Sequence, residues 1–286
     1  MNTQFWVIQV FNGVSYGALL FLVGSGLSLI FGVMRIVNLS HGSYFMLGGY
    51  IALSVINATG SWALSIPLAA LAVAVIGLLM ERVFLRPLGF DPLRQVLLTV
   101  GFAFLFQQAA LDIWGGNNMD ITPPAVLTRS IVVGGVYLPT YRIFMIGLAL
   151  AIGLALWLVI EKTRVGAAVR ATVDDAQMAR GVGIDTNRIS MFIFALGAFL
   201  AAVGGVIGGA FLGVFPGLDF EMLPLAFAVV IIGGMGSLSG AAIGALLVGL
   251  ADNFGKALFP EISYFTLYAP MVLILAVKPT GLFGRE

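Results

Sequence analysis

Long stretches without a charged side chain dominate this sequence and restrict what it can fold into. Seven of them follow one another along the chain, at residues 1–34, 42–80, 95–111, 143–160, 189–218, 222–251 and 262–277. A transmembrane helix needs about 20 mainly apolar residues to cross the hydrocarbon core of a bilayer. Only 9% of all residues are charged, against roughly 25% in an ordinary soluble domain. We therefore predict an all-α polytopic membrane protein with seven or eight transmembrane segments, folded as a single transmembrane domain over residues 1–286.

Basic residues predict the orientation of these segments, because short loops rich in Lys and Arg stay in the cytoplasm. Eleven of the 14 basic residues fall at Arg35, in 81–94, in 161–188 or in the C-terminal tail. We expect these parts to face the cytoplasm, with the N-terminus outside and the C-terminus inside. That orientation requires a broken or re-entrant helix in the stretch 222–251, so that the chain returns to the outer face.

Two segments interrupt the apolar stretches. The first holds the only histidine of the chain and reads Asn38-Leu39-Ser40-His41-Gly42, and the second is glycine-rich and reads Gly233-Gly234-Met235-Gly236-Ser237-Leu238-Ser239-Gly240. Non-helical backbone persists at membrane depth where it is buried in protein or lines a water-filled cavity, and broken helices often form transporter sites. The alternatives are a capped turn at the cytoplasmic surface for 38–42 and a plain flexible turn for 233–240. We expect no metal at a lone histidine, and no lysine follows the glycines as a phosphate-binding loop requires.

The segment 161–190 joins two predicted spans and is expected to contain an amphipathic helix over 167–180. One face of that helix carries small apolar side chains and the other is polar, with Arg170, Asp174 and Gln177. Gly181 and Gly183 are expected to end it. Alanine and valine anchor a helix in lipid only weakly, so this face is better suited to a groove in another protein.

Smaller patterns complete the prediction. Residues 113–141 form the only long polar segment on the predicted outer side, and Ser130–Leu138 is expected to form a hairpin around Gly134-Gly135. Glycines four residues apart let helix backbones approach closely, and we interpret them as packing within one bundle rather than as a subunit interface. They occur at Gly204 and Gly208, at Gly205 and Gly209, and at Gly240 and Gly244.

Composition excludes several classes of function. A net charge of +1 and the lack of any basic run argue against nucleic-acid binding. One histidine, no cysteine and no paired carboxylates within the spans leave no catalytic constellation, so no enzyme activity is expected. A stand-alone channel or secondary transporter would need intramembrane acids or bases. The stretches 42–80, 189–218 and 222–251 contain none.

Three motifs resemble those of branched-chain amino-acid ABC transporter permeases, and specifically the smaller of the two paired permease types. Residues 38–42 are similar to an N-x-x-H-G signature, and 233–241 are similar to a glycine signature near the C-terminus. The segment around Arg170-Ala171, Asp174, Met178-Ala179, Gly183-Ile184 and Arg188-Ile189 resembles the cytoplasmic coupling loop. The general coupling motif begins Glu-Ala-Ala, whereas this chain has Asp174 and Asp175 at that place.

The resemblance implies a pore-forming permease subunit of an ATP-driven importer for Leu, Ile and Val in the bacterial inner membrane. It implies a second homologous permease, two ATP-binding subunits that hydrolyse ATP, and a periplasmic solute-binding protein. The binding protein would dock on 113–141. No cofactor is implied. Coupling to the ATPase is expected at Arg170, Ala171, Asp174, Ala179, Gly183 and Ile184. The translocation path is expected at Asn38, Ser40, His41, Gly42, Gly233, Gly234, Gly236, Ser237 and Gly240. A permease of the same family for urea or short amides remains an alternative.

Overall fold

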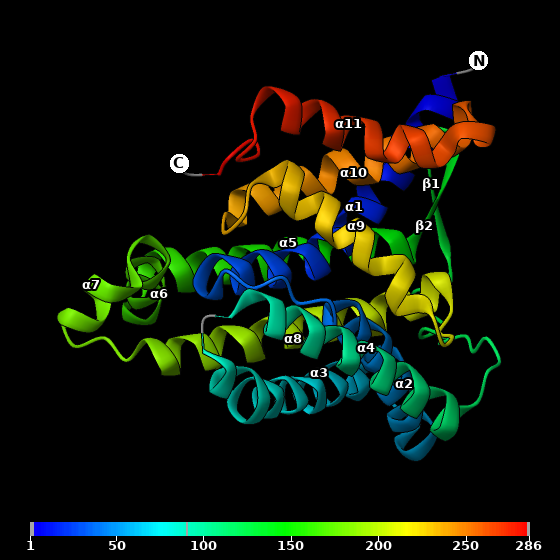
Figure 1. The fold of residues 1–286 in the computed structure, drawn as a ribbon. Coiled ribbons are helices and arrows are strands. Elements are labelled where there is room, and N and C mark those ends of the chain that lie inside the picture. Colours follow the sequence, from blue (N-terminus) through cyan, green and yellow to red (C-terminus); the bar gives the residue numbers. More distant parts are fainter. Residues whose placement is uncertain (1–2, 90, 285–286) are drawn as a thin grey trace.

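The computed structural model describes residues 3–89 and 91–284 and shows a bundle of helices (Figure 1). Residues 1, 2, 285 and 286, at the ends of the predicted domain, lie outside the described residues. The helices and strands are α1 (Thr3–Met34), α2 (His41–Thr59), α3 (Trp62–Met80), the π-helical turn η1 (Glu81–Leu85), the 3-10 turn η2 (Arg86–Leu88), α4 (Pro92–Trp114), β1 (Ser130–Val133), β2 (Val136–Pro139), α5 (Thr140–Lys162), α6 (Arg164–Asp174), α7 (Ala176–Gly181), α8 (Thr186–Leu212), α9 (Leu218–Gly233), α10 (Leu238–Leu258), the 3-10 turn η3 (Pro260–Ile262) and α11 (Ser263–Val277).

Six helical segments among the described residues are long and apolar enough to cross a membrane on their own. They are α1, α3 with its extension to Leu88, α4, α5, α8 and α10. Helices α2, α9 and α11, of 19, 16 and 15 residues, accompany them. The prediction of an all-α polytopic membrane protein with broken helices is confirmed.

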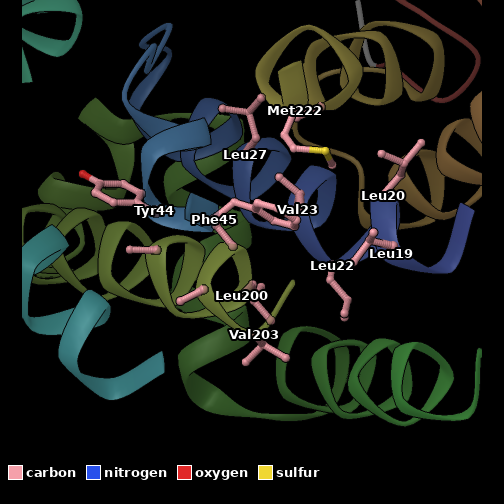
Figure 2. Packing of buried hydrophobic residues seen from close by; sticks show 14 of the residues in the cluster. Leu19, Leu20, Leu22, Val23, Leu27, Tyr44, Phe45, Leu200, Val203 and Met222 are labelled. Carbon is pink, nitrogen blue, oxygen red and sulfur yellow. The ribbon is translucent and has the colours of Figure 1, made fainter. Parts of the chain in front are cut away.

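Helices α1 and α8 form the centre of the bundle. In their most apolar windows 78% and 72% of residues are buried, against 22% in α4 and 17% in α5. Figure 2 shows Phe45 of α2 lying between Val23 of α1 and the α8 side chains Leu200 and Val203. The central helices are therefore covered by other helices, and α4 and α5 have most of their surface on the outside of the bundle.

Glycines set the close spacing in this centre. A Cβ at Gly204 would lie 3.0 Å from the side chain of Val23, and one at Gly205 would overlap the carbonyl oxygen of Phe45. A Cβ at Gly244 would overlap the carbonyl oxygen of Val229 in the neighbouring helix α9. These glycine pairs pack within the chain itself, as predicted, because a larger residue would force the helices apart.

The two ends of the bundle are distinct. At one end, which we call the coupling end, α6 and α7 lie near the C-terminal tail and the turn at 234–237, whereas the β-hairpin and the N-terminus lie at the opposite end (Figure 1). Leu282 N donates to the carbonyl oxygen of Ile232 at 2.9 Å, which ties the tail to the coupling end. The turn at 234–237 reverses the chain between α9 and α10, so the predicted break in 222–251 is confirmed.

The loop between α4 and α5 contains the predicted hairpin. Strands β1 and β2 pair antiparallel, with Val133 opposite Val136. Gly134 and Gly135 have φ values of 59° and 80°, the left-handed conformations that a two-residue hairpin turn requires and that glycine adopts without strain. Before the hairpin, Met119 pairs with Val214, so the loop also covers the connection between α8 and α9.

The predicted single helix over 167–180 is wrong, because the structure has two helices, α6 and α7, separated at Asp175. Asp175 has extended backbone angles (φ −153°, ψ 103°), and its Oδ1 accepts hydrogen bonds from the amides of Gln177 and Met178 at 2.8 and 3.0 Å. An aspartate that caps a new helix cannot continue the previous one. The predicted glycine end is present, since Gly183 has φ 90° and Ile184 N donates back to Ala179 O at 2.9 Å.

Candidate functional site

The first interruption, at 38–42, lies inside the bundle. Helix α1 ends before Arg35, which is the only described non-glycine residue with a positive φ, at 55°. The six residues 35–40 can extend over up to about 20 Å and lead the chain back into the interior. Nε2 of His41, the first residue of α2, donates to the carbonyl oxygen of Val23 at 3.0 Å. Because Val23 lies about 16 Å from the end of α1, α2 starts well within the bundle and not in a surface turn.

Side chains on the way into α2 bond mainly to one another. Asn38 Oδ1 accepts from both the amide and the hydroxyl of Ser40, at 3.1 and 2.7 Å. The amide of Leu39 donates to Thr99 Oγ1 of α4 at 3.2 Å. Asn38, Ser40 and His41 are completely buried, yet Asn38 Nδ2 and His41 Nδ1 have no hydrogen-bond partner among the described residues. Buried polar atoms are normally paired, so this region has unused hydrogen-bonding capacity.

The start of α2 meets the start of α9. A Cβ on Gly42 would overlap the backbone carbonyl of Asp219, so the two first turns touch through their backbones. Ser43 Oγ donates to Asp219 Oδ2 at 2.9 Å, and Asp219 is 2% exposed. Its neighbour Phe220 packs on Phe104, near the middle of α4, with ring centroids 5.5 Å apart. A buried carboxylate therefore lies at membrane depth.

Sequence reasoning missed Asp219. The charge-free stretches end at 218 and resume at 222, which assigns this residue to a connection between spans. The structure places it instead in the first turn of α9, after Gly217 with φ 106°. A glycine followed by an acidic pair at the start of an apolar run, here Asp219 and Glu221, is a typical helix start and could have placed Asp219 on the helix.

The second interruption is a compact turn at the coupling end. Gly234 and Gly236 have φ values of 103° and 80°, and Gly236 approaches Gly32 of α1 so closely that a Cβ would lie 3.0 Å from its Cα. Ser237 Oγ accepts from the amide of Gly240 at 3.0 Å and caps α10. Ser28 Oγ of α1 donates to Ser237 O at 3.4 Å. Both interruptions thus contact α1: the first at Val23, and the second at Ser28 and Gly32, about 8 and 14 Å further along its axis.

The predicted coupling residues divide into exposed and buried ones. Asp174 and Gly183 are exposed, Arg170, Ala171 and Ile184 are half-buried, and Ala179 is buried. Arg170 bonds to the end of α5 through Glu161, at 3.5 Å, and through the carbonyl oxygen of Ile160. The tip of the segment also exposes two apolar side chains, Met178 and Val182, at 70% and 78%, and neither was among the predicted coupling residues.

An ion pair connects the coupling end to the start of α2. Glu81, 2% exposed in the π-helical turn η1, bonds to Arg86 at 3.1 Å. Arg86 Nη2 also donates at 3.2 Å to the carbonyl oxygen of Asn187, in the first turn of α8, the helix that follows α7. Met80, adjacent to Glu81, accepts a hydrogen bond from Tyr44 of α2 at 2.9 Å. Sequence spacing gave no sign of this chain of contacts, because π-helical turns have no clear sequence signal.

Comparison with known proteins identifies the family. The family model described as branched-chain amino acid transport system / permease component matches residues 9–275. This chain belongs to that family. The permease is 32% identical to the high-affinity branched-chain amino acid transport system permease protein BraD of Pseudomonas aeruginosa, over 97% of this chain and 95% of BraD. It is 30% identical to LivH of Escherichia coli K12, a permease of the same description, over 100% of this chain and 98% of LivH.

A longer relative is also similar. LivM of Escherichia coli K12 is 27% identical over 91% of this permease but over only 67% of its own length. The nearly complete coverage of BraD and LivH agrees with the predicted smaller permease type. No solved structure matches the permease.

Proposed function

We propose that this permease is one of two pore-forming subunits of an ATP-driven ABC importer for Leu, Ile and Val in the bacterial cytoplasmic membrane. The observation that carries the proposal is the similarity to BraD and LivH along nearly the whole chain. The partners are a second homologous permease, two ATP-binding subunits and a periplasmic solute-binding protein. ATP is hydrolysed on the partner subunits, and residues 1–286 act as one transmembrane domain without a cofactor.

In this proposal the coupling end faces the cytoplasm. The arrangement of basic residues supports it, because Arg35, Arg86 and Arg188 all belong to segments at that end. The N-terminus and the β-hairpin loop then lie outside. That loop, within the predicted 113–141, is the surface on which the binding protein docks.

The segment α6–α7 then transmits closure of the ATP-binding subunits. Its tip offers the exposed Met178 and Val182 to a groove in the ATPase. The buried Ala179 and the Arg170 bond to α5 hold it as a rigid piece. Movement passes into α8 at Asn187, and the Glu81–Arg86 pair conveys it to α3 and the start of α2. Energetic coupling of this kind travels through packed and hydrogen-bonded groups with two arrangements.

The start of α2 and the glycine turn line the translocation path in the state in which substrate passes. The side chains of Asn38, Ser40 and His41 are buried in this structure, so they reach a substrate only when the neighbouring helices separate. A mainly apolar path fits the side chains of Leu, Ile and Val. When the helices separate, the polar groups at 38–42 become accessible to the substrate.

Purification from the native membrane tests the proposal. We expect a tagged chain, extracted in mild detergent, to bring with it one second permease and two ATP-binding subunits, and the assembly in liposomes to take up radiolabelled leucine only with ATP and the binding protein. A binding protein that carries urea or an amide would establish the alternative substrate within the same family. A chain that purifies alone as a stable homo-oligomer and transports without ATP would overturn the importer.

A further inference from the structure

Three carboxylates are buried among the described residues, and one of them has no basic partner. Glu81 pairs with Arg86 at 3.1 Å and Asp252 pairs with Lys256 at 2.7 Å. Asp219 forms no ion pair in the described part of the chain, and its Oδ1 accepts no hydrogen bond there. A buried acid without a counter-charge is costly, and an ionisable residue inside a membrane bundle is usually functional.

The carboxyl group of Asp219 is held by nearby donors, but its Oδ1 has no hydrogen-bond partner among the described residues. Ser43 Oγ bonds to Oδ2 at 2.9 Å, and backbone amides in the first turn of α9, at Gly217 and Phe220, also interact with the carboxyl group. The first turns of α2 and α9 meet here, and each helix start carries a partial positive charge. The arrangement holds the carboxyl group in place and leaves Oδ1 available to a ligand that donates a hydrogen bond.

Aromatic side chains lie on the helices that meet at this position. Tyr50 lies seven residues after Ser43, hence on the same face of α2, and its buried hydroxyl has no hydrogen-bond partner among the described residues. Its ring stacks on Trp114, with centroids 4.9 Å apart. Carboxylates and aromatic faces both attract cationic groups, so this part of the bundle suits a ligand with a cationic group and an apolar remainder.

The surface is close to Asp219 along the chain. The next side chain, Phe220, is 41% exposed, and Glu221 is exposed as well. The connection before α9 contains two glycines with positive φ, Gly213 at 80° and Gly217 at 106°, conformations that glycine adopts without strain. In the proposal below, a shift of the first turn of α9 presents Oδ1 to the substrate.

We propose that Asp219 binds the α-ammonium group of the amino acid as it crosses the bundle, an inference that rests on the proposed function. Leu, Ile and Val are zwitterions. An apolar path accommodates their side chains, but their buried ammonium group requires a hydrogen-bond acceptor there. Asp219 supplies that acceptor. The positive ends of α2 and α9 lie beside it and favour the substrate's own carboxylate.

The first test compares two carboxyl substitutions in the reconstituted importer. Asp219→Asn keeps the shape of the side chain and removes its charge, and we expect leucine uptake to fall roughly 10- to 100-fold, as for loss of a hydrogen bond to a charged group. Glu221→Gln changes an exposed carboxylate two residues away and leaves uptake unchanged. Assembly with the partner subunits and thermal unfolding establish that both variants fold. If Asp219→Asn folds and transports like the wild type, the inference is wrong.

The second test reads the ligand chemistry directly. Wild-type importer hydrolysing ATP in the presence of its binding protein is treated with dicyclohexylcarbodiimide, and modification of Asp219 is followed by peptide mass spectrometry. We expect saturating leucine, or isopentylamine in the absence of leucine, to slow modification about tenfold. Isocaproate, which lacks the ammonium group, gives no protection.

Other outcomes separate the possible failures. Protection by isocaproate, protection by sodium ions instead of leucine, or no protection by any of these ligands overturns the ammonium site. If wild-type importer, assembled with its partners, takes up no leucine at all, the proposed function itself fails. Wild-type leucine uptake combined with an unaffected Asp219→Asn variant leaves the importer intact and rejects only the role of Asp219.

Discussion

The two interruptions of the bundle differ in the contacts that dominate them. At 233–240 the turn is closed by backbone contacts, with Gly233 against Gly240 and Gly236 against Gly32. At 38–42 the turn is closed by polar side chains, and two of their atoms, Asn38 Nδ2 and His41 Nδ1, have no hydrogen-bond partner among the described residues. Backbone contacts of this kind fix one geometry. Unused polar atoms instead keep bonding capacity that a moving helix or a passing ligand can use.

The largest loss of stability is expected when the glycine turn at 233–240 is disrupted. Gly240→Leu places a side chain where the backbone of Gly233 lies, and we expect a loss of about 3 kcal/mol of stability or more, because neither helix backbone can yield. The measurement is the midpoint of thermal unfolding in detergent together with the yield of monodisperse protein. Gly101→Ala is the matched control, because a Cβ there meets nothing within 4 Å and alanine favours a helix. A stable, monodisperse Gly240→Leu protein would contradict the role given to the turn.

The next effect concerns the Glu81–Arg86 ion pair, which links the first turn of α8 to the polar interruption at the start of α2. Arg86→Met leaves Glu81 without its partner in a site where that side chain is 3% exposed. We expect a loss of about 1–3 kcal/mol, below the value for a fully buried pair because Arg86 itself is 34% exposed. The double variant Glu81→Gln with Arg86→Met should recover much of this stability, while leucine uptake stays low if the pair transmits movement. Full recovery of uptake would show that the pair is only structural.

The sequence predicted the parts of the fold that local chemistry decides. Gly134-Gly135 between β-prone residues specified the hairpin, and four glycines within 233–240 specified the turn. The split at Asp175 was missed because the sequence pattern suits one continuous helix, whereas the Asp175 side chain caps a second helix. Asp219 was missed because charges were taken to mark the ends of spans, and only tertiary packing shows that this acid turns inward. The Glu81–Arg86 pair was missed because it forms across a π-helical turn, and the bond from Arg86 to Asn187 O depends on the approach of α8, which no local pattern reports.

A smaller effect on stability is expected at the polar interruption. His41→Leu removes the bond to Val23 O but keeps the cavity filled, so we expect a loss of about 1–2 kcal/mol. If the start of α2 belongs to the path, leucine uptake falls more than this loss of stability explains. The measurement is uptake per folded importer, with thermal unfolding in parallel. His41→Gln, which retains a donor, is the control and should keep part of the uptake. Equal uptake in both variants and the wild type would remove His41 from the path.

The smallest effect on stability is expected at Gly183, and it separates coupling from folding. A Cβ there meets nothing within 4 Å, but the backbone has φ 90°, so Gly183→Leu costs about 1 kcal/mol of local strain. That strain loosens the bond from Ile184 N to Ala179 O and tilts the exposed tip of α7. Basal ATP hydrolysis should therefore continue while leucine transported per ATP falls. Gly181→Ala is matched, since its surroundings are equally open and its φ is not positive, and it should couple normally. Normal coupling in Gly183→Leu would mean that the ATPase binds another surface of the permease. Movement would then have to reach the polar interruption at 38–42 by a route that does not start at α7.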